Sequence, residues 1–398
     1  MFSALETRHK TLNLSPHISQ LILACLYLLA LLLVAAGTSP LNPETGFAPP
    51  PFPADDSSGP ALIESHFVTR DDTRESHAAS GTVDAEGRLL AVWYGGSEEG
   101  AYDVRLFRAY LGEKRWQEPS ALVDVHLAQQ QLSRYVRKIG NPVIFQHSGG
   151  RQYLFFVTVS AGGWAGSALN VQVSDDQGQT WSPMQRLITS PFLNISTLVR
   201  GNPFEYADGS IGLPVYHEFL GKFTELLRLS PDLEVLDKTR LHHGRASLQP
   251  EVAVLSATEA VVVMRSAEPR PRYIWASRTR DAGLSWQPPQ PLSLPNPNAA
   301  VALLALGPED LLLVFNDTQQ YRRDLTLARS EDGGNSWRRL HRFEDSRDTD
   351  PDLDLQYAYP WLGRDTQGQF HLIYTWNQRE IKHITFNNAW LRQVSGHE

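Results

Sequence analysis

The sequence contains a single cysteine, Cys25, among its 398 residues. This cysteine lies in the apolar stretch "LILACLYLLALLLVAAG" (residues 21–37), so the chain beyond it has no thiol. The absence excludes disulfide bonds, cysteine-based metal sites and a cysteine nucleophile from that part. The HExxH, P-loop and EF-hand patterns are absent as well, and we therefore expect no metal ion and no cofactor.

The sequence also lacks an excess of positive charge. Its formal net charge is −8, and no block rich in Lys and Arg interrupts the acidic and neutral background. This composition argues against nucleic acid as a partner. If the ligand is itself acidic, individual arginines must bind it against an unfavourable overall field.

Only one long apolar run is present, and it lies near the N-terminus. Basic residues precede it within residues 1–16, which we expect to be a cytoplasmic segment, and residues 17–38 are expected to be a signal anchor or a cleaved signal peptide. Residues 39–60 carry seven prolines and predict an extended linker. The rest of the chain is then exported, either anchored in the membrane on the periplasmic or extracellular side or secreted.

Strong helical periodicity is absent from residues 61–398, but a short turn pattern recurs there. The octets "SDDQGQTW" (174–181), "TRDAGLSW" (279–286) and "SEDGGNSW" (330–337) share an acidic residue, a glycine and a final tryptophan. The carboxylate can accept backbone hydrogen bonds within the turn, and the tryptophan can then be buried between neighbouring units.

The spacing of these octets predicts the fold. The final tryptophans lie 51 and 105 residues apart, and segments with a turn followed by an apolar strand recur six times at a similar period. Six units of about 50 residues, each with four strands, make a six-bladed β-propeller of the all-β class. We expect residues 62–70 to add a strand to the last blade and to close the ring.

The three octets resemble the Asp-box, or BNR, repeats of the sialidase (neuraminidase) superfamily. The segments "AVWYGGSEEGAYDV", "YAYPWL" and "YTWNQREIKH" resemble its predicted-neuraminidase branch. The resemblance implies a propeller that binds a sugar carboxylate through three arginines. It also implies a tyrosine nucleophile activated by a glutamate, and a separate carboxylic acid that serves as acid and base.

Mapped by distance to the following strand turn, the resemblance assigns a role to each of several residues. Arg265 and Arg322 match the second and third arginines, with Arg323 as the alternative to Arg322, and Tyr359 matches the nucleophile. Tyr357 would point to the same side of the strand as Tyr359. Arg137 and Arg200 begin other blades and are further candidates for substrate binding, together with their neighbours Lys138, Asn141 and Asn202.

Two positions depart from the family pattern. His77 replaces the first arginine, and Gln249 replaces the glutamate that pairs with the tyrosine. Histidine could act there as a base or an acid, and Glu251 is a candidate substitute carboxylate. For the acid–base role, the loop "YGGSEEGAYDV" offers Glu99, with Asp103 as the second candidate and Glu98 beside them.

These observations predict a sialidase-like exo-glycosidase that acts on acidic sugars of a surface polysaccharide or glycoconjugate. Because His77 and Gln249 depart from the pattern, two alternatives stay open. One is a non-catalytic carbohydrate-binding propeller, and the other is a polysaccharide lyase on the same scaffold. The expected partners are an acidic glycan and, through the N-terminal helix, a membrane.

Overall fold

The computed structural model describes residues 15–37, 45–52, 59–69, 73–113, 115–191, 193–349 and 355–396. The chain divides into two compact units, Met1–Pro40 and Leu41–Glu398. In the first unit, helix α1 (Pro16–Gly37) occupies most of the predicted anchor or signal peptide, whereas residues 1–14 and residue 38 lie outside the described part. Within the described ranges, no helix combines the length and the apolar character needed to cross a membrane. The membrane role of this segment stays a prediction.

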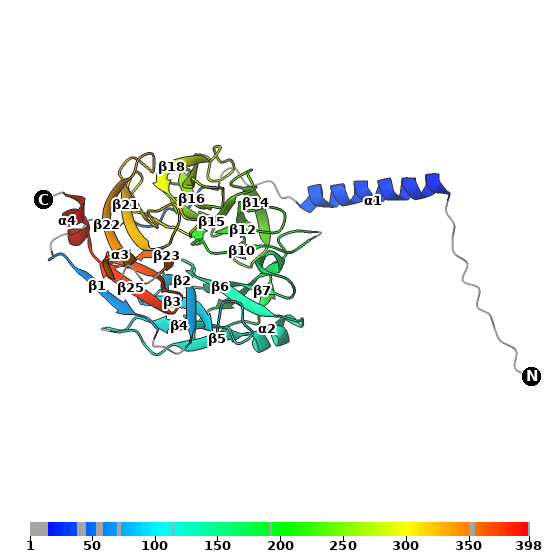
Figure 1. Ribbon diagram of the computed structural model, residues 1–398. Helices are drawn as coiled ribbons and strands as arrows, with labels where there is room; N and C mark the ends of the chain where they lie inside the picture. Colours follow the sequence, from blue (N-terminus) through cyan, green and yellow to red (C-terminus); the bar gives the residue numbers. More distant parts are fainter. Residues whose placement is uncertain are drawn as a thin grey trace, which may run out of the picture. The chain divides into compact units, whose positions relative to one another are not determined.

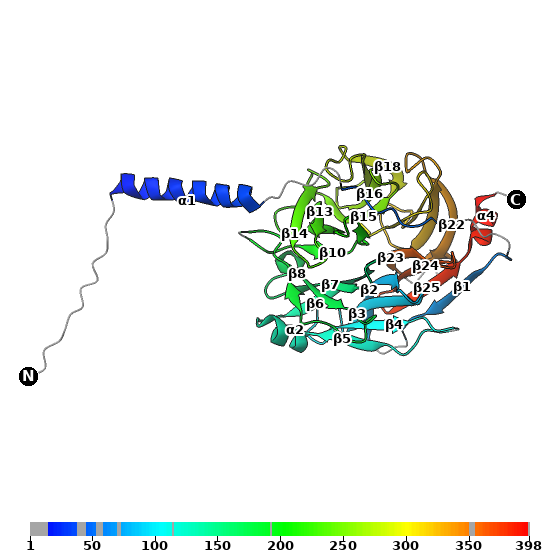
Figure 2. The same cartoon turned by 180° about the vertical axis from the view of Figure 1, so that it is seen from behind.

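The second unit consists of six antiparallel sheets (Figures 1 and 2). From inner to outer strand the sheets are β2–β5 (Glu75–Val83, Leu89–Gly96, Arg105–Tyr110, Ser120–Asp124), β6–β9 (Lys138–Gln146, Gln152–Val159, Ser167–Ser174, Gln185–Arg186), β10 and β12–β14 (Leu198–Val199, Ile211–His217, Phe223–Leu229, Val235–Arg240), β15–β18 (Ser247–Val254, Ala260–Ser266, Tyr273–Thr279, Gln290–Pro295), β19–β22 (Ala302–Ala305, Leu311–Phe315, Asp324–Ser330, Arg338–Asp345), and β23–β25 with β1 (Tyr357–Arg364, Phe370–Trp376, Glu380–Phe386, Ile63–Phe67). The short β11 (Phe204–Glu205) pairs with β12. The remaining elements are the helices α2 (Val125–Leu132), α3 (Ser346–Thr349) and α4 (Asn388–Ser395) and the 3₁₀ turn η1 (Trp164–Gly166).

The inner strands of successive sheets pack against one another and form a ring. Strand β2 contacts both β6 and β23, and the intervening sheets make corresponding contacts around the circle. The ring closes because β1 pairs with β25, with Ile63 opposite Phe386 and Phe67 opposite Lys382. The all-β class, the six blades and the closing strand predicted from the sequence are therefore confirmed.

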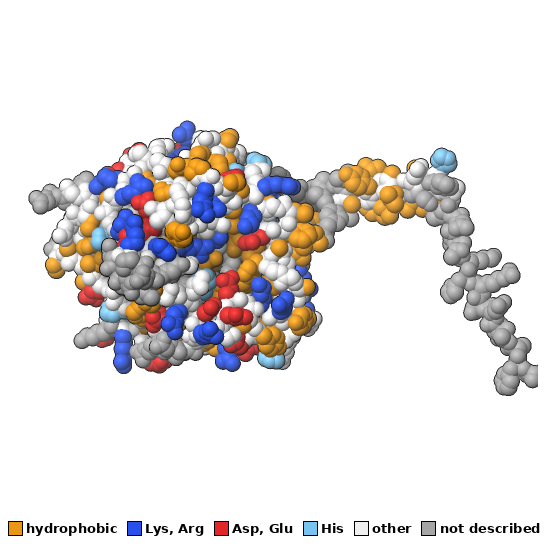
Figure 3. All heavy atoms as spheres, viewed as in Figure 1, with side chains coloured by type: hydrophobic (Ala, Val, Ile, Leu, Met, Phe, Trp, Pro, Cys, Tyr) orange, Lys and Arg blue, Asp and Glu red, His pale blue; other side chains and the backbone are white. Residues whose placement is uncertain are grey.

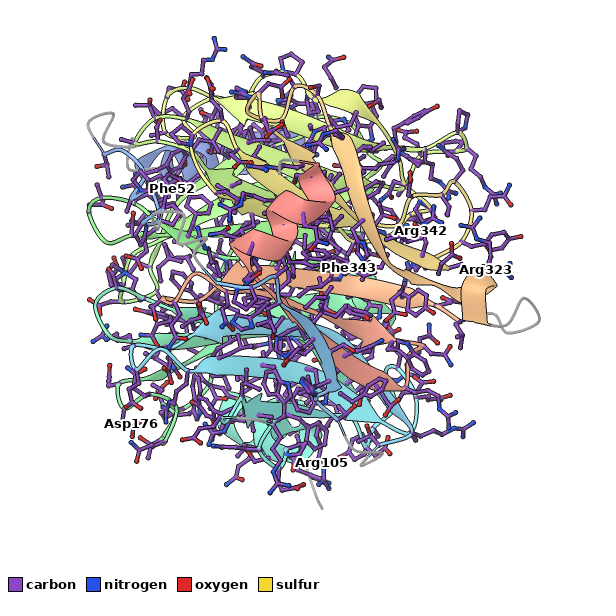
Figure 4. The ribbon with its side chains drawn as sticks, turned by 90° about the vertical axis from the view of Figure 1, so that its left-hand side faces the viewer. Phe52, Arg105, Asp176, Arg323, Arg342 and Phe343 are labelled. Atoms are coloured by element: carbon purple, nitrogen blue, oxygen red, sulfur yellow. The ribbon has the colours of Figure 1, made fainter. Side chains whose placement is uncertain are left out.

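The three octets form identical outer turns between the third and fourth strands of their sheets. In the first, Asp176 accepts hydrogen bonds from the Thr180 amide (2.8 Å) and hydroxyl (2.6 Å), and the Ser174 hydroxyl accepts one from the Gly178 amide (2.8 Å). Trp181 then packs against the apolar cluster shared by the first and second sheets. Asp176 lies at the periphery of the propeller (Figure 4), so these turns stabilise the fold and do not supply the site.

Part of the predicted linker packs on the propeller. Phe47 is 1% exposed, and its amide donates to the carbonyl of Ala257 (2.7 Å). Its ring lies 5.2 Å from that of Tyr206, and Pro49–Pro51 help to line a cavity of about 440 Å³ at the C-terminal ends of the inner strands. Residues 45–52 therefore extend the packed unit before position 61, whereas residues 53–58 lie outside the described part.

Candidate active site

The site is built on interruptions in four inner strands. In β2, β6, β15 and β23 the register with the next strand shifts across two residues, which is a β-bulge. The first residue of each bulge has a positive φ: Ala78 (51°), Asn141 (49°), Gln249 (48°) and Tyr359 (53°). Because a bulge bends its strand and redirects side chains, groups from distant blades meet at one end of the ring.

Tyr359 lies among three arginines. The guanidinium groups of Arg200 and Arg322 each lie 5.7 Å from the centroid of its ring. Burial raises the pKa of Tyr359, but the positive charges of Arg265 and Arg322 outweigh that effect, and the pKa lies below its ordinary value. This environment favours a phenolate, which is a better nucleophile than the phenol.

Asn298 holds two of these arginines in place. Its side-chain oxygen accepts a hydrogen bond from Arg265 Nε (2.7 Å), and its backbone carbonyl accepts one from Arg322 Nη2 (2.9 Å). A second bond joins Arg265 Nη1 to the amide oxygen of Gln249 (2.9 Å). The two guanidinium groups thus approach each other without an acidic partner among these bonds, an arrangement that suits a carboxylate ligand.

His77 is buried against Tyr359. The rings are 4.6 Å apart and nearly perpendicular, and His77 is 4% exposed. Burial, followed by the charges of Arg322 and Arg200, lowers the pKa of His77 to about 3. At neutral pH the ring is therefore uncharged, and it cannot act as a third cation for a carboxylate. Its Nδ1 atom has no hydrogen-bond partner in the described structure.

Glu99 lies on the other side of His77. Its Oε2 is 4.0 Å from His77 Nε2, and its Oε1 accepts a hydrogen bond from Trp164 Nε1 (3.0 Å). The Glu99 amide donates to the Glu75 carboxylate (2.7 Å), which fixes the loop. The side chain is 42% exposed and so can exchange protons with solvent.

The other acidic residues of this loop are placed differently. Asp103 accepts hydrogen bonds from the amide (3.1 Å) and the hydroxyl (2.9 Å) of Ser97 and thereby closes the loop. Glu98 is exposed on the turn itself. Only Glu99 has a printed contact with the groups around Tyr359.

Arg200 supports Tyr359 from behind. This arginine is 1% exposed and donates through Nη2 to the carbonyls of Tyr359 (2.8 Å) and Pro360 (2.9 Å). Its nearest balancing charge is Glu251, whose pKa burial raises to about 7, although Arg200 and the Asn202 amide oppose that rise. Arg200 therefore helps to hold the bulge of β23 in its shape as well as adding positive charge.

Three of the predicted site residues lie elsewhere. Tyr357 is 1% exposed, and its ring packs in the core 6.5 Å from that of Tyr374. The guanidinium of Arg323 lies over the exposed ring of Tyr321, at the edge of the molecule (Figure 4). Arg137 is exposed at the start of β6. In contrast, Glu99, His77, Gln249, Arg265, Arg322, Arg200 and Tyr359 come together.

Two further residues belong to the same cluster but were not predicted from the sequence. Tyr216 is 2% exposed and accepts hydrogen bonds from Asn141 (3.0 Å) and Gln249 (3.4 Å), and Asn298 orients the arginines. A usable signal exists for the bulges themselves, because Asn141, Gln249 and Tyr359 each precede a proline. Among the described residues, no group of three or more His, Cys, Asp or Glu side chains is placed to bind a metal ion.

Comparison with known proteins bears on both the fold and the arrangement of this cluster. Residues 87–372 match the family model described as a BNR repeat-like domain. The chain belongs to this BNR repeat-like family. No curated protein matches the sequence.

Solved structures resemble this BNR repeat-like protein in fold. A Hadza microbial sialidase shares 17% identity over 81% of this chain and 68% of its own, with a TM-score of 0.67. The leech intramolecular trans-sialidase shares 11% identity over 84% of this chain and 70% of its own, with a TM-score of 0.65. A Trypanosoma rangeli sialidase shares 11% identity over 90% of this chain and 61% of its own, with a TM-score of 0.59. The BNR repeat-like protein is therefore a propeller of the sialidase superfamily.

Proposed function

We propose that the protein is a sialidase-like exo-glycosidase that removes a terminal carboxylated sugar from a glycan. The observation that supports this most strongly is the position of Tyr359 among Arg200, Arg265 and Arg322, with Glu99 nearby. Arg265 and Arg322 bind the sugar carboxylate, because a guanidinium fork matches its two oxygens. Binding of the carboxylate places the anomeric carbon next to Tyr359.

The proposed reaction has two steps. In the first, the Tyr359 oxygen forms a bond to the anomeric carbon while the bond to the leaving oxygen breaks, and that oxygen takes a proton from Glu99. In the second, Glu99 takes a proton from water, whose oxygen replaces the Tyr359 oxygen on the sugar. The arginines stabilise the phenolate before the first step, so Gln249 need not accept the tyrosine proton.

His77 takes a different role from that of a third arginine. Its low pKa keeps the ring neutral, so it contributes a polar surface between Tyr359 and Glu99 rather than a charge. We infer that two arginines carry the carboxylate. We also propose that the protein acts outside the cytoplasm, since the apolar segment before the propeller is typical of exported proteins.

The test measures the products released by the full-length protein. An aryl glycoside of N-acetylneuraminic acid and a panel of carboxylated oligosaccharides serve as substrates. We expect free sugar acid from the wild type and at least a thousandfold lower kcat for Tyr359→Phe. Tyr321→Phe, at an exposed ring, is the matched control and should keep full activity. An unsaturated, ultraviolet-absorbing product would indicate a lyase and would overturn the proposal.

A second candidate function is non-catalytic carbohydrate binding. It is favoured by Gln249, whose amide oxygen is bonded to Arg265 and has no capacity to remove a proton. Calorimetry then gives binding of N-acetylneuraminic acid without any product from its glycosides. Restoring a carboxylate with Gln249→Glu would produce hydrolysis only if the remaining machinery is competent, which separates a lost activity from a site that never had one.

A further inference from the structure

A second cavity lies on the same face of the propeller as the candidate active site. It has a volume of about 490 Å³, within the range of small-ligand sites, and it lies between the loop 160–166 and the segments around Arg186 and Phe219. The loop joins the end of β7 to the start of β8, and the inner strand β6 begins beside it with the bulge at Asn141. The cavity is therefore next to the candidate active site and separate from it.

Loop 160–166 forms a wall between the two spaces. Trp164 faces the active site, because its Nε1 donates to Glu99 and Lys138 Nζ lies 3.9 Å above its ring. Gly162 and Gly163, in the same loop, line the second cavity, and a Cβ added at either would meet open space. A ligand longer than one sugar residue can thus pass from one space to the other over this loop.

The charge of the second cavity is positive. Arg134 and Arg186 line it, and in the described part of the chain neither has an acidic partner within ion-pair distance. Arg186 Nη2 donates to the carbonyl of Asn194 (2.5 Å), while its Nε is buried and has no hydrogen-bond partner. An unsatisfied buried N–H is costly, and an anionic oxygen would relieve that cost.

The opposite wall supplies an apolar surface. Phe219 lines the cavity and is 51% exposed, and Ile195 lies against the same space. A flat aromatic side chain beside paired arginines is typical of a site that contacts a sugar ring on its face and a carboxylate at its edge. A small inorganic anion would use only the arginines and would leave Phe219 without a role.

We propose that this cavity, defined by Arg134, Arg186 and Phe219, binds a second carboxylated sugar residue of the substrate. The inference rests on the proposed function, because the first carboxylated residue occupies the site at Tyr359. The preferred substrate class is then a glycan with two adjacent acidic sugars. Binding of the first residue raises the effective concentration of the second at Arg186, so a dimer binds more tightly than a monomer.

Calorimetry on the full-length Tyr359→Phe variant, which does not cleave the probe, tests the proposal. The probes are N-acetylneuraminic acid and its α2,8-linked dimer. We expect the dimer to bind at least tenfold more tightly than the monomer, and Arg186→Met to remove that advantage. Arg134→Met is the second variant, and Arg280→Met, on an exposed outer turn, is the control that should leave both affinities unchanged.

The outcomes distinguish the two proposals. Equal affinities for monomer and dimer, or an equal loss of both in Arg186→Met, would overturn the second site. Failure of either probe to bind would do the same. Dimer binding that depends on Arg186 while the monomer gives no signal would support the second site and count against the proposed function of the Tyr359 site. Thermal unfolding of each variant verifies that the propeller is intact.

Discussion

The burial of a neutral histidine gives the sharpest prediction. His77 has a pKa of about 3 in the folded protein, whereas an unfolded chain has the ordinary value of 6.5. The proposed change is His77→Gln, because glutamine keeps a polar side chain of similar length and does not titrate. The quantity to measure is the free energy of unfolding of wild type and variant as a function of pH.

The sign follows from proton binding. Between pH 6.5 and pH 3 the unfolded wild type binds a proton at His77 and the folded wild type does not, so its free energy of unfolding falls as the pH is lowered. The slope is about 1.4 kcal/mol per pH unit, or about 3 kcal/mol between about pH 6.5 and pH 4.5. The variant has no such contribution, so it gains stability relative to wild type by about that amount on acidification.

Urea denaturation followed by tryptophan fluorescence, at several pH values in this range, supplies the comparison. Other titrating groups affect both proteins and cancel in the difference between them. Exposed His126, changed to glutamine in the same way, is the control for a histidine that is not buried. A wild-type minus His77→Gln difference that stays constant from pH 6.5 to pH 4.5 would refute the argument that His77 is buried and neutral beside the arginines.

Three further predictions concern the fold and the reaction. Asp281→Ala removes the acceptor for the Ser285 amide and hydroxyl, and should lower the free energy of unfolding by about 2 kcal/mol, with Arg280→Ala as an exposed control. Phe47→Ala should cost about 3 kcal/mol in the same urea assay, because the ring is 1% exposed; no change would mean that residues 45–52 do not belong to the propeller. Glu99→Gln should lower kcat on the aryl glycoside by about a hundredfold or more, whereas Glu98→Gln should retain it.

The fold could be predicted from the sequence because its signal is local and repeated. Each octet contains its own hydrogen-bond donors and acceptors, so the turn at Asp281 forms the same bonds as the turn at Asp332. Local repetition fails at the ends of the ring. Trp390 follows the octet period, yet it lies in helix α4, because the last blade takes its fourth strand from β1 rather than from the following chain.

The positions of single side chains were harder to predict than the blades. An alternating strand places Tyr357 and Tyr359 on the same side, and that assumption made both tyrosines candidates. The bulge at Tyr359 breaks the alternation, so Tyr357 packs beside Tyr374 while Tyr359 meets the arginines. A similar ambiguity separates Arg322 from Arg323, since only the register of the strand end decides which of two adjacent residues faces the ring centre.

Surface charge adds little to this assignment. On the face drawn in Figure 3, acidic and basic side chains lie among one another, so no single field would draw an anionic ligand to the site. Recognition must instead come from the buried groups, where low dielectric strengthens each charge. Arg322 illustrates this, because its burial lowers the pKa of its guanidinium while the nearby Tyr359 opposes that change.

The bulges explain how one repeated strand supplies four different chemistries. The second residue of a bulge has no ladder partner, so proline, which lacks an amide proton, is tolerated there, as at Pro142, Pro250 and Pro360. The first residue is released from the alternation and projects away from its sheet. It can therefore change from asparagine to glutamine or tyrosine without loss of a strand hydrogen bond. We infer that the fold confines chemical variation to these positions, and that the identity of four residues determines what the centre of the ring can do.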